Sequence, residues 1–159
     1  MNNFDAHILV VDDDDGIRNL VKKYLNENNY LITTAKDAKD ADEKIKIIKF
    51  DLIILDIMMP GQTGLEFLKI NKKIINTPVI LLTAKGEPKE RIEGLEIGAD
   101  DYLPKPFEPK ELVLRIKNIL EKMINSPGKS FSRDYIGNLI DIDKERSIDV
   151  IITRLRKKN

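Results

Sequence analysis

The sequence predicts an α/β fold in which a five-stranded parallel sheet is covered by helices on both faces. Short aliphatic runs alternate with longer segments whose apolar residues recur at helical spacing, from residue 7 to about residue 124. This alternation is typical of successive βα units. The aliphatic runs are continuous, which is typical of strands that are buried on both faces of a parallel sheet. Proline, glycine and asparagine separate the segments and favour turns between them.

The first half of this region contains three predicted strands and two predicted helices. The strands span residues 8–11, 31–35 and 51–55, and the helices span 16–28 and 38–49. The first helix ends at a pair of asparagines. In each helix the apolar residues follow one face: Ile17, Leu20, Val21, Tyr24 and Leu25 in the first, and Ala38, Ala41, Ile45 and Ile48 in the second.

The second half of the region adds three helices and two strands. The strands span 78–82 and 102–103. One helix begins at Gly64, a second spans about 89–97, and a third begins at Pro109, since proline is favoured at the first helical position. Their apolar positions are, in order, Leu65, Leu68 and Ile75, then Ile92 and Leu95 before a closing Gly98, and finally Leu112, Ile116, Ile119 and Met123.

Five βα units in succession leave few topologies, because crossovers between parallel strands are right-handed. The simplest arrangement is the flavodoxin-like strand order 2-1-3-4-5. We therefore expect one domain over residues 1–124. Residues 125–130 have the composition of a linker, and residues 131–159 are expected to form a short helical C-terminal segment. That segment is locally basic, with a net charge of +4 from residue 144 onward.

Composition disfavours several classes of function. The chain has no cysteine, which excludes disulfides and thiolate chemistry. A single histidine, His7, is a poor basis for Ser-His-Asp catalysis or for a histidine metal cluster. No apolar run approaches the ~18 residues of a membrane span, and the N-terminus lacks a signal sequence, so we expect a soluble, cytoplasmic protein without membrane partners. The 27 basic and 27 acidic residues balance, so net charge neither supports nor opposes nucleic-acid binding.

Asp56 ends the third predicted strand just before a turn at Pro60 and Gly61. Ligands of open α/β sheets bind at the carboxyl ends of strands. A carboxylate that caps the turn is an equally good explanation of this stretch alone. The neighbouring strand favours chemistry, because Asp12 and Asp13 end the first strand, which should lie beside the third.

The three carboxylates would raise each other's pKa and destabilise the fold unless a cation is present. An all-oxygen site of this kind suits Mg²⁺. Thr83 and Lys105 end the fourth and fifth strands at the same edge of the sheet. Their hydroxyl and ammonium groups could meet the oxygens of a phosphoryl group on Asp56, and in-line phosphoryl transfer needs little more than such positioning.

Other interpretations explain parts of this pattern. Asp14 and Asp15 are best explained as acids at a helix N-terminus. A calcium loop is disfavoured, because counting from Gly16 as its sixth position places Val11 and Lys22 at the two terminal ligand positions. A phosphatase with an aspartyl nucleophile usually has a second aspartate two residues later, where this chain has Met58.

Several stretches resemble the receiver domain of bacterial two-component response regulators, most closely the OmpR/PhoB subfamily, over about residues 6–124. These stretches are 8–13, 56–61 together with Gly64, 82–84, 98–102 and 105–107. The resemblance implies that Asp56 is phosphorylated by a sensor histidine kinase. It also implies a signalling phosphoacceptor rather than an enzyme, with self-dephosphorylation as its only turnover.

The resemblance assigns further roles around Asp56. Asp12, Asp13 and Asp56, with the backbone carbonyl of Met58, would hold Mg²⁺. Thr83 and Lys105 would sense the phosphoryl group, and Tyr102 would be an aromatic switch that turns inward when Thr83 moves. A cis peptide bond is implied between Lys105 and Pro106, in agreement with the general preference of cis bonds for proline.

The resemblance also implies an output through dimerisation. Phosphorylation would add about −1.5 to −2 charges at Asp56 and bias the surface of the fourth helix, fifth strand and fifth helix, where the subfamily dimerises. Charged residues of both signs occur there, as in the subfamily's intersubunit pairs: Arg91, Glu96, Asp100, Asp101, Glu111, Arg115 and Lys122.

The C-terminal segment resembles the last two helices of the subfamily's winged-helix DNA-binding domain, but its β-platform, first helix and wing are missing. Specific readout of DNA needs a fixed docking geometry. One hypothesis is a transcriptional regulator that contacts DNA; the other is a signalling module without a competent DNA-binding output, encoded by an internally deleted gene. The candidate DNA contacts are Arg146, Thr153, Arg154, Arg156 and Lys157.

Overall fold

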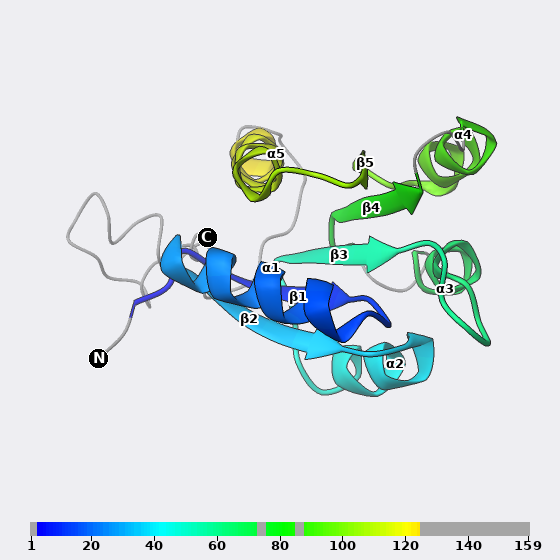
Figure 1. The fold of residues 1–159 in the computed structure, drawn as a ribbon, viewed down its shortest axis with the longest axis horizontal. Helices are drawn as coiled ribbons and strands as arrows, with labels where there is room; N and C mark the ends of the chain where they lie inside the picture. Colours follow the sequence, from blue (N-terminus) through cyan, green and yellow to red (C-terminus); the bar gives the residue numbers. More distant parts are fainter. Residues whose placement is uncertain (1–2, 73–75, 85–87, 125–159) are drawn as a thin grey trace.

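Five parallel strands form a single sheet in the computed structural model, which describes residues 3–72, 76–84 and 88–124. The strand order is β2-β1-β3-β4-β5, and each neighbouring pair is parallel, which confirms the predicted topology (Figure 1). The strands are β1 (Ala6–Val11), β2 (Tyr30–Ala35), β3 (Leu52–Asp56), β4 (Val79–Ala84) and β5 (Asp101–Lys105).

Five helices connect and cover the strands. They are α1 (Asp15–Glu27), α2 (Ala38–Ile45), α3 (Gly64–Asn71), α4 (Pro88–Ile97) and α5 (Pro109–Ile124). Buried residues of α1 and α5 form one core cluster with the sheet, and those of α2 and α3 form a second one. The sheet is therefore the middle of three layers.

Residues of β1 show why the strands are continuous aliphatic runs. Ile8 and Val10 belong to the core cluster beneath α1 and α5, whereas Leu9 and Val11 belong to the cluster beneath α2 and α3. Successive side chains of a strand point to opposite faces, so a strand covered on both sides needs apolar residues at every position.

Side-chain caps fix where the helices begin. Asp14 is the N-cap of α1 and accepts a hydrogen bond from the Ile17 backbone N–H at 2.9 Å, and Asp15 lies in the first turn. The interpretation of these two residues as helix N-terminal acids is therefore confirmed. At the start of α3, Thr63 and Glu66 form a reciprocal capping box.

The helix predicted over 38–49 is shorter in the structure, because α2 ends at Ile45. The chain then turns, and the Ile48 backbone N–H donates to the Lys44 carbonyl at 2.9 Å. Ile48 still packs against the core. The spacing of apolar residues thus predicted burial correctly at Ile48 but overestimated the length of the helix.

The prediction that Ile92 and Leu95 are the packed positions of α4 is wrong. Their side chains are 52% and 41% exposed. The buried residue of α4 is Gly94, where an added Cβ would lie 2.2 Å from Leu81 Cδ1. The absence of a side chain at Gly94 lets α4 approach β4, and this orientation turns Ile92 and Leu95 toward solvent.

Some predictions concern residues outside the described ranges. They include the apolar position Ile75, the linker 125–130, and the segment 131–159 with the candidate DNA contacts Arg146, Thr153, Arg154, Arg156 and Lys157. Within the described ranges, no helix is both long and apolar enough to cross a membrane.

We expect His7 to make folding stability dependent on pH. Its Nε2 lies 2.7 Å from Thr33 Oγ1, its ring packs edge-on against Phe50, and burial lowers its pKa from 6.5 to about 4. The unfolded chain therefore takes up a proton first, so this stability is fully present above pH 6.5 and is lost as the pH falls toward 4. The loss should reach at most about 3 kcal/mol.

Urea unfolding of the wild type and of His7→Gln between pH 4 and 8 would measure this effect. The glutamine amide can still hydrogen-bond to Thr33 but does not titrate. The difference in unfolding free energy between the two proteins should change between pH 6.5 and 4. Two parallel pH profiles would contradict the assignment to His7.

Candidate functional site

Three carboxylates meet at the carboxyl edge of the sheet. Asp12 and Asp13 follow β1, Asp56 ends β3, and these two strands are direct neighbours. One ligand oxygen from each of the three lies within 4.8 Å of the others. Asp12 is completely buried and Asp56 is 3% exposed, whereas Asp13 is exposed. The convergence predicted from the sequence is thus present in the structure.

Lys105, at the end of β5, reaches across β4 to this cluster. Its Nζ lies 2.9 Å from Asp12 Oδ2 and 3.3 Å from Asp56 Oδ1. Burial disfavours its charged form, but the hydrogen bond to Asp12 and the negative charges of Asp56 and Asp12 outweigh burial and raise the pKa of Lys105. The peptide bond from Lys105 to Pro106 is cis, as the resemblance implies.

Asp56 is poised to change its ionisation near neutral pH. Burial, followed by the negative charge of Asp12, raises its pKa from 3.8 to about 6. The charge of Lys105 and hydrogen bonds from Lys105 and the Met58 backbone oppose that rise. Above pH 6 the Asp56 side chain is therefore an ionised carboxylate in a buried site, paired with a single ammonium group.

Asp12 is held in place by its own contacts. Its Oδ1 accepts a hydrogen bond from the Asp14 backbone N–H at 2.9 Å, while Oδ2 faces Lys105. Arg18, on α1, donates to the Asp12 backbone carbonyl at 2.7 Å. This role of Arg18 was not predicted, because no sequence pattern indicates it and it depends on how α1 packs beside the end of β1.

The donor set fits a divalent cation. Three ionised carboxylates and one ammonium leave an excess of two negative charges among side chains whose oxygens already lie close together. Hard oxygen ligands at a partly open site suit Mg²⁺. Asp13 is the exposed member of the set and provides the side that solvent can reach. The role of the Met58 carbonyl remains a prediction.

Thr83 and Tyr102 lie next to this cluster in the sheet. Thr83 is 3% exposed and directly follows Leu82, the β4 partner of Asp56. Tyr102 is partly buried and lies opposite Leu81, two residues before Thr83. Because residues two apart on a strand share a face, Tyr102, Leu81 and Thr83 lie on the same face of the sheet.

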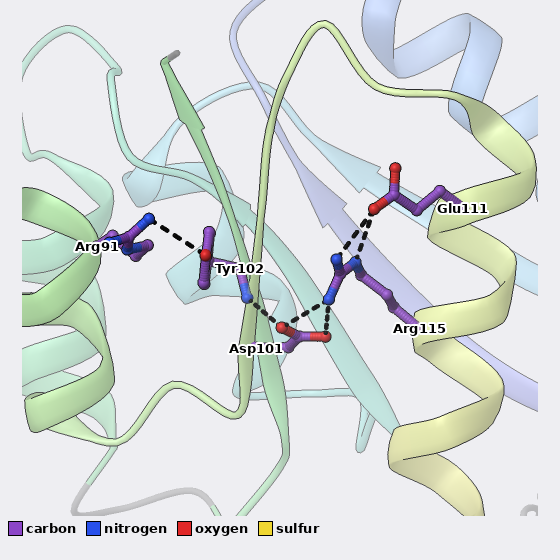
Figure 2. A network of polar contacts seen from close by, with 5 residues as sticks. All are labelled: Arg91, Asp101, Tyr102, Glu111 and Arg115. Carbon is purple, nitrogen blue, oxygen red and sulfur yellow. Dashed lines mark hydrogen bonds and ion pairs between the residues drawn. The ribbon is translucent and has the colours of Figure 1, made fainter. Parts of the chain in front are cut away.

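A polar network connects Tyr102 with α4 and α5 (Figure 2). Arg91 donates to the Tyr102 hydroxyl at 3.2 Å, and Arg115 makes two hydrogen bonds to the carboxylate of Asp101, at 2.9 and 3.1 Å. Arg115 also pairs with Glu111 at 2.9 Å. The sequence predicted a mixture of charges here, but not that Arg115 pairs with both Asp101 and Glu111 within one chain.

Comparison with known proteins places this arrangement in a family. Residues 8–117 match the profile of the response regulator receiver domain. Protein PetR of Rhodobacter capsulatus is 54% identical over 117 residues, which cover 74% of this chain and 49% of PetR. The phosphate regulon transcriptional regulatory protein PhoB of Pseudomonas aeruginosa is 42% identical over 136 residues, covering 84% of this chain and 58% of PhoB.

A solved structure agrees with these matches. The receiver domain of the Francisella response regulator 1452 is 42% identical, with a TM-score of 0.70, and the match covers 74% of this chain and 98% of that domain. The chain spans only about half the length of the curated relatives it matches. The family match over residues 8–117 includes Asp12, Asp13 and Asp56.

Proposed function

This chain belongs to the family of response regulator receiver domains, and on that premise we propose that it is a phosphorylation-dependent signalling switch of the OmpR/PhoB type. Asp56 accepts a phosphoryl group from a sensor histidine kinase. The observation that supports this most directly is the position of Asp56 beside two further carboxylates and an ammonium group at one edge of the sheet.

The transfer uses the ionised side chain of Asp56. One of its carboxylate oxygens attacks the phosphorus of a phosphohistidine; the new O–P bond forms as the N–P bond breaks, and the imidazole leaves. Mg²⁺, held by Asp12, Asp13 and Asp56 with the Met58 carbonyl, would neutralise charge on the phosphoryl oxygens. Lys105 and the Thr83 hydroxyl are proposed to contact the same oxygens in the product.

The output is proposed to be dimerisation through the α4–β5–α5 face, defined here by Ile92 and Leu95 on α4, Asp101 on β5, and Leu114 and Arg115 on α5. Leu114, like Ile92 and Leu95, is largely exposed, at 53%. Exposed apolar side chains rimmed by charges are typical of protein interfaces.

The domain boundaries at 124 and 130 are part of the proposal, since the switch needs a linker to act on the C-terminal segment.

Two candidate outputs extend beyond the receiver. PhoB is named as a transcriptional regulatory protein. By analogy, one candidate is control of transcription through DNA contacts in residues 131–159. The other candidate is a signalling module without a DNA-binding output. Gel-shift experiments with the full chain and with a chain ending at residue 124 would distinguish them, because only a DNA-binding segment makes the two proteins behave differently.

We expect the protein to incorporate one phosphoryl group per chain when it is incubated with Mg²⁺ and acetyl phosphate. The product should be an acyl phosphate that is stable in acid and labile in base, because the acceptor is a carboxylate. Mass spectrometry would measure labelling, and sedimentation velocity would follow the conversion of monomer to dimer.

The same incubation without Mg²⁺ is the control and should label far more slowly. Steady turnover of general phosphomonoesters would contradict the proposal and favour an aspartyl phosphatase. Labelling without any change in sedimentation would support phosphorylation of the chain but contradict the proposed dimerisation.

A further inference from the structure

Arg91 contacts Tyr102 in two ways at once. One guanidinium N–H donates to the Tyr102 hydroxyl at 3.2 Å, and the guanidinium carbon lies 4.8 Å from the centroid of the ring. Figure 2 shows Arg91 reaching from α4 to the tyrosine on β5. A cation over the ring together with a hydrogen bond at its tip restricts both the position and the rotation of the ring.

This contact is one of those that join α4 to the rest of the domain, together with the partly buried Ile97, which packs against the core. Among the described residues of α4, the buried one is Gly94, which has no side chain. By comparison, α5 buries Leu112, Val113, Ile116, Ile119 and Leu120. Elements that move in a switch come from the weakly anchored part of a structure. A side-chain contact that holds α4 to β5 is therefore well placed to control such a movement.

The contact also lies on the face of the sheet that includes Thr83. Tyr102 is opposite Leu81, and Thr83 is the next residue of β4 on that face. A rearrangement at Thr83 would reach the tyrosine ring through neighbouring positions of β4 and β5, and the ring in turn is held by Arg91.

We propose that Arg91 is a positioning residue that holds the Tyr102 ring against α4 in the unphosphorylated chain. This inference rests on the proposed function, since it names the contact that the switch must release. A group that stabilises one of two states sets their ratio through its differential interaction. Weakening the contact between Arg91 and Tyr102 therefore favours the phosphorylated arrangement. By reciprocity, the site around Asp56 then binds a phosphoryl mimic more tightly.

The test uses fluorine NMR of the full chain, in which all four tyrosines are replaced by 3-fluorotyrosine. Tyr102→Phe identifies the Tyr102 resonance by its loss. Arg91→Gln should shift that resonance in the direction produced by beryllium fluoride, a mimic of the phosphoryl group. The affinity for beryllium fluoride in Mg²⁺ should rise about threefold to tenfold. Arg91→Lys retains the charge without the flat guanidinium and should give an intermediate result.

Lys89→Gln is the matched control, because it removes one positive charge from the first turn of the same helix and should leave both measurements at their wild-type values. An unchanged Tyr102 resonance in Arg91→Gln, or an affinity equal to that of Lys89→Gln, would overturn the proposal. If the wild type binds no beryllium fluoride, the phosphoacceptor assignment fails. In that case a shift in Arg91→Gln still supports the positioning of Tyr102, and an unchanged resonance rejects it.

Discussion

Asp56→Asn is expected to abolish formation of the acyl phosphate without unfolding the protein. The amide has nearly the shape of the carboxylate, but it lacks a nucleophilic anionic oxygen. Asp12 is not expected to replace it, since both of its carboxylate oxygens are engaged, one by Lys105 and the other by the Asp14 backbone. Labelling with acetyl phosphate and Mg²⁺, followed by mass spectrometry, should fall below detection.

The matched control for this experiment is Asp14→Asn. Asp14 caps α1 through the Ile17 N–H, and asparagine caps a helix about as well as aspartate does. This variant should be labelled like the wild type. Undiminished labelling of Asp56→Asn, or loss of labelling in the control, would remove Asp56 as the acceptor.

Asp56→Asn should also stabilise the fold at neutral pH. Burial and the charge of Asp12 raise the pKa of Asp56 to about 6, so the folded chain prefers the protonated form. The stability that protonated Asp56 contributes is therefore fully present below pH 3.8, and it is lost as the pH rises through 6. Without Mg²⁺, Asp56→Asn should be more stable than the wild type by about 1–2 kcal/mol at pH 7.5, and the difference should vanish near pH 4.

The edge of the sheet was predictable from the sequence because its geometry follows from topology. Once five βα units are recognised, the ends of parallel strands must meet at one edge. Asp12, Asp56 and Lys105 could therefore be expected together, and the structure brings them within ion-pair distance. Burial of the strands on both faces was predictable for a similar reason, since unbroken aliphatic runs have few alternatives.

The α4–β5–α5 face was less predictable, because it depends on side-chain packing. Two apolar residues three apart, Ile92 and Leu95, were too few to define the buried side of α4. That side is set by Gly94, which has no side chain and lets the helix approach β4. The charges of Arg115, Asp101 and Glu111 were identified, but not their pairing within one chain. In the proposed dimer, exposed ion pairs would contribute little net free energy, so the exposed apolar side chains would supply most of the affinity.

Gly64→Ala should destabilise the domain more than any surface substitution. Gly64 is the first residue of α3, and its backbone N–H donates to the Ile57 carbonyl at 2.9 Å. A Cβ at this position would lie 2.1 Å from the carbonyl oxygen of Asp56 and 2.9 Å from Ile57 Cα. These neighbours are backbone atoms and cannot turn aside, so α3 or the end of β3 must move. We expect a loss of at least about 3 kcal/mol, the upper end for overpacking.

Urea unfolding followed by circular dichroism would measure this loss, with Gly16→Ala as the matched control. Gly16 also lies in the first turn of a helix, but its added Cβ would meet only a side-chain oxygen of Asp14, at 3.2 Å. Alanine is a better helix former than glycine, so this control should be neutral or more stable by up to about 1 kcal/mol. Equal unfolding curves for the two variants would show that α3 can retreat from Asp56 at little cost. In that case the close approach of α3 would not be what fixes the end of β3 in place.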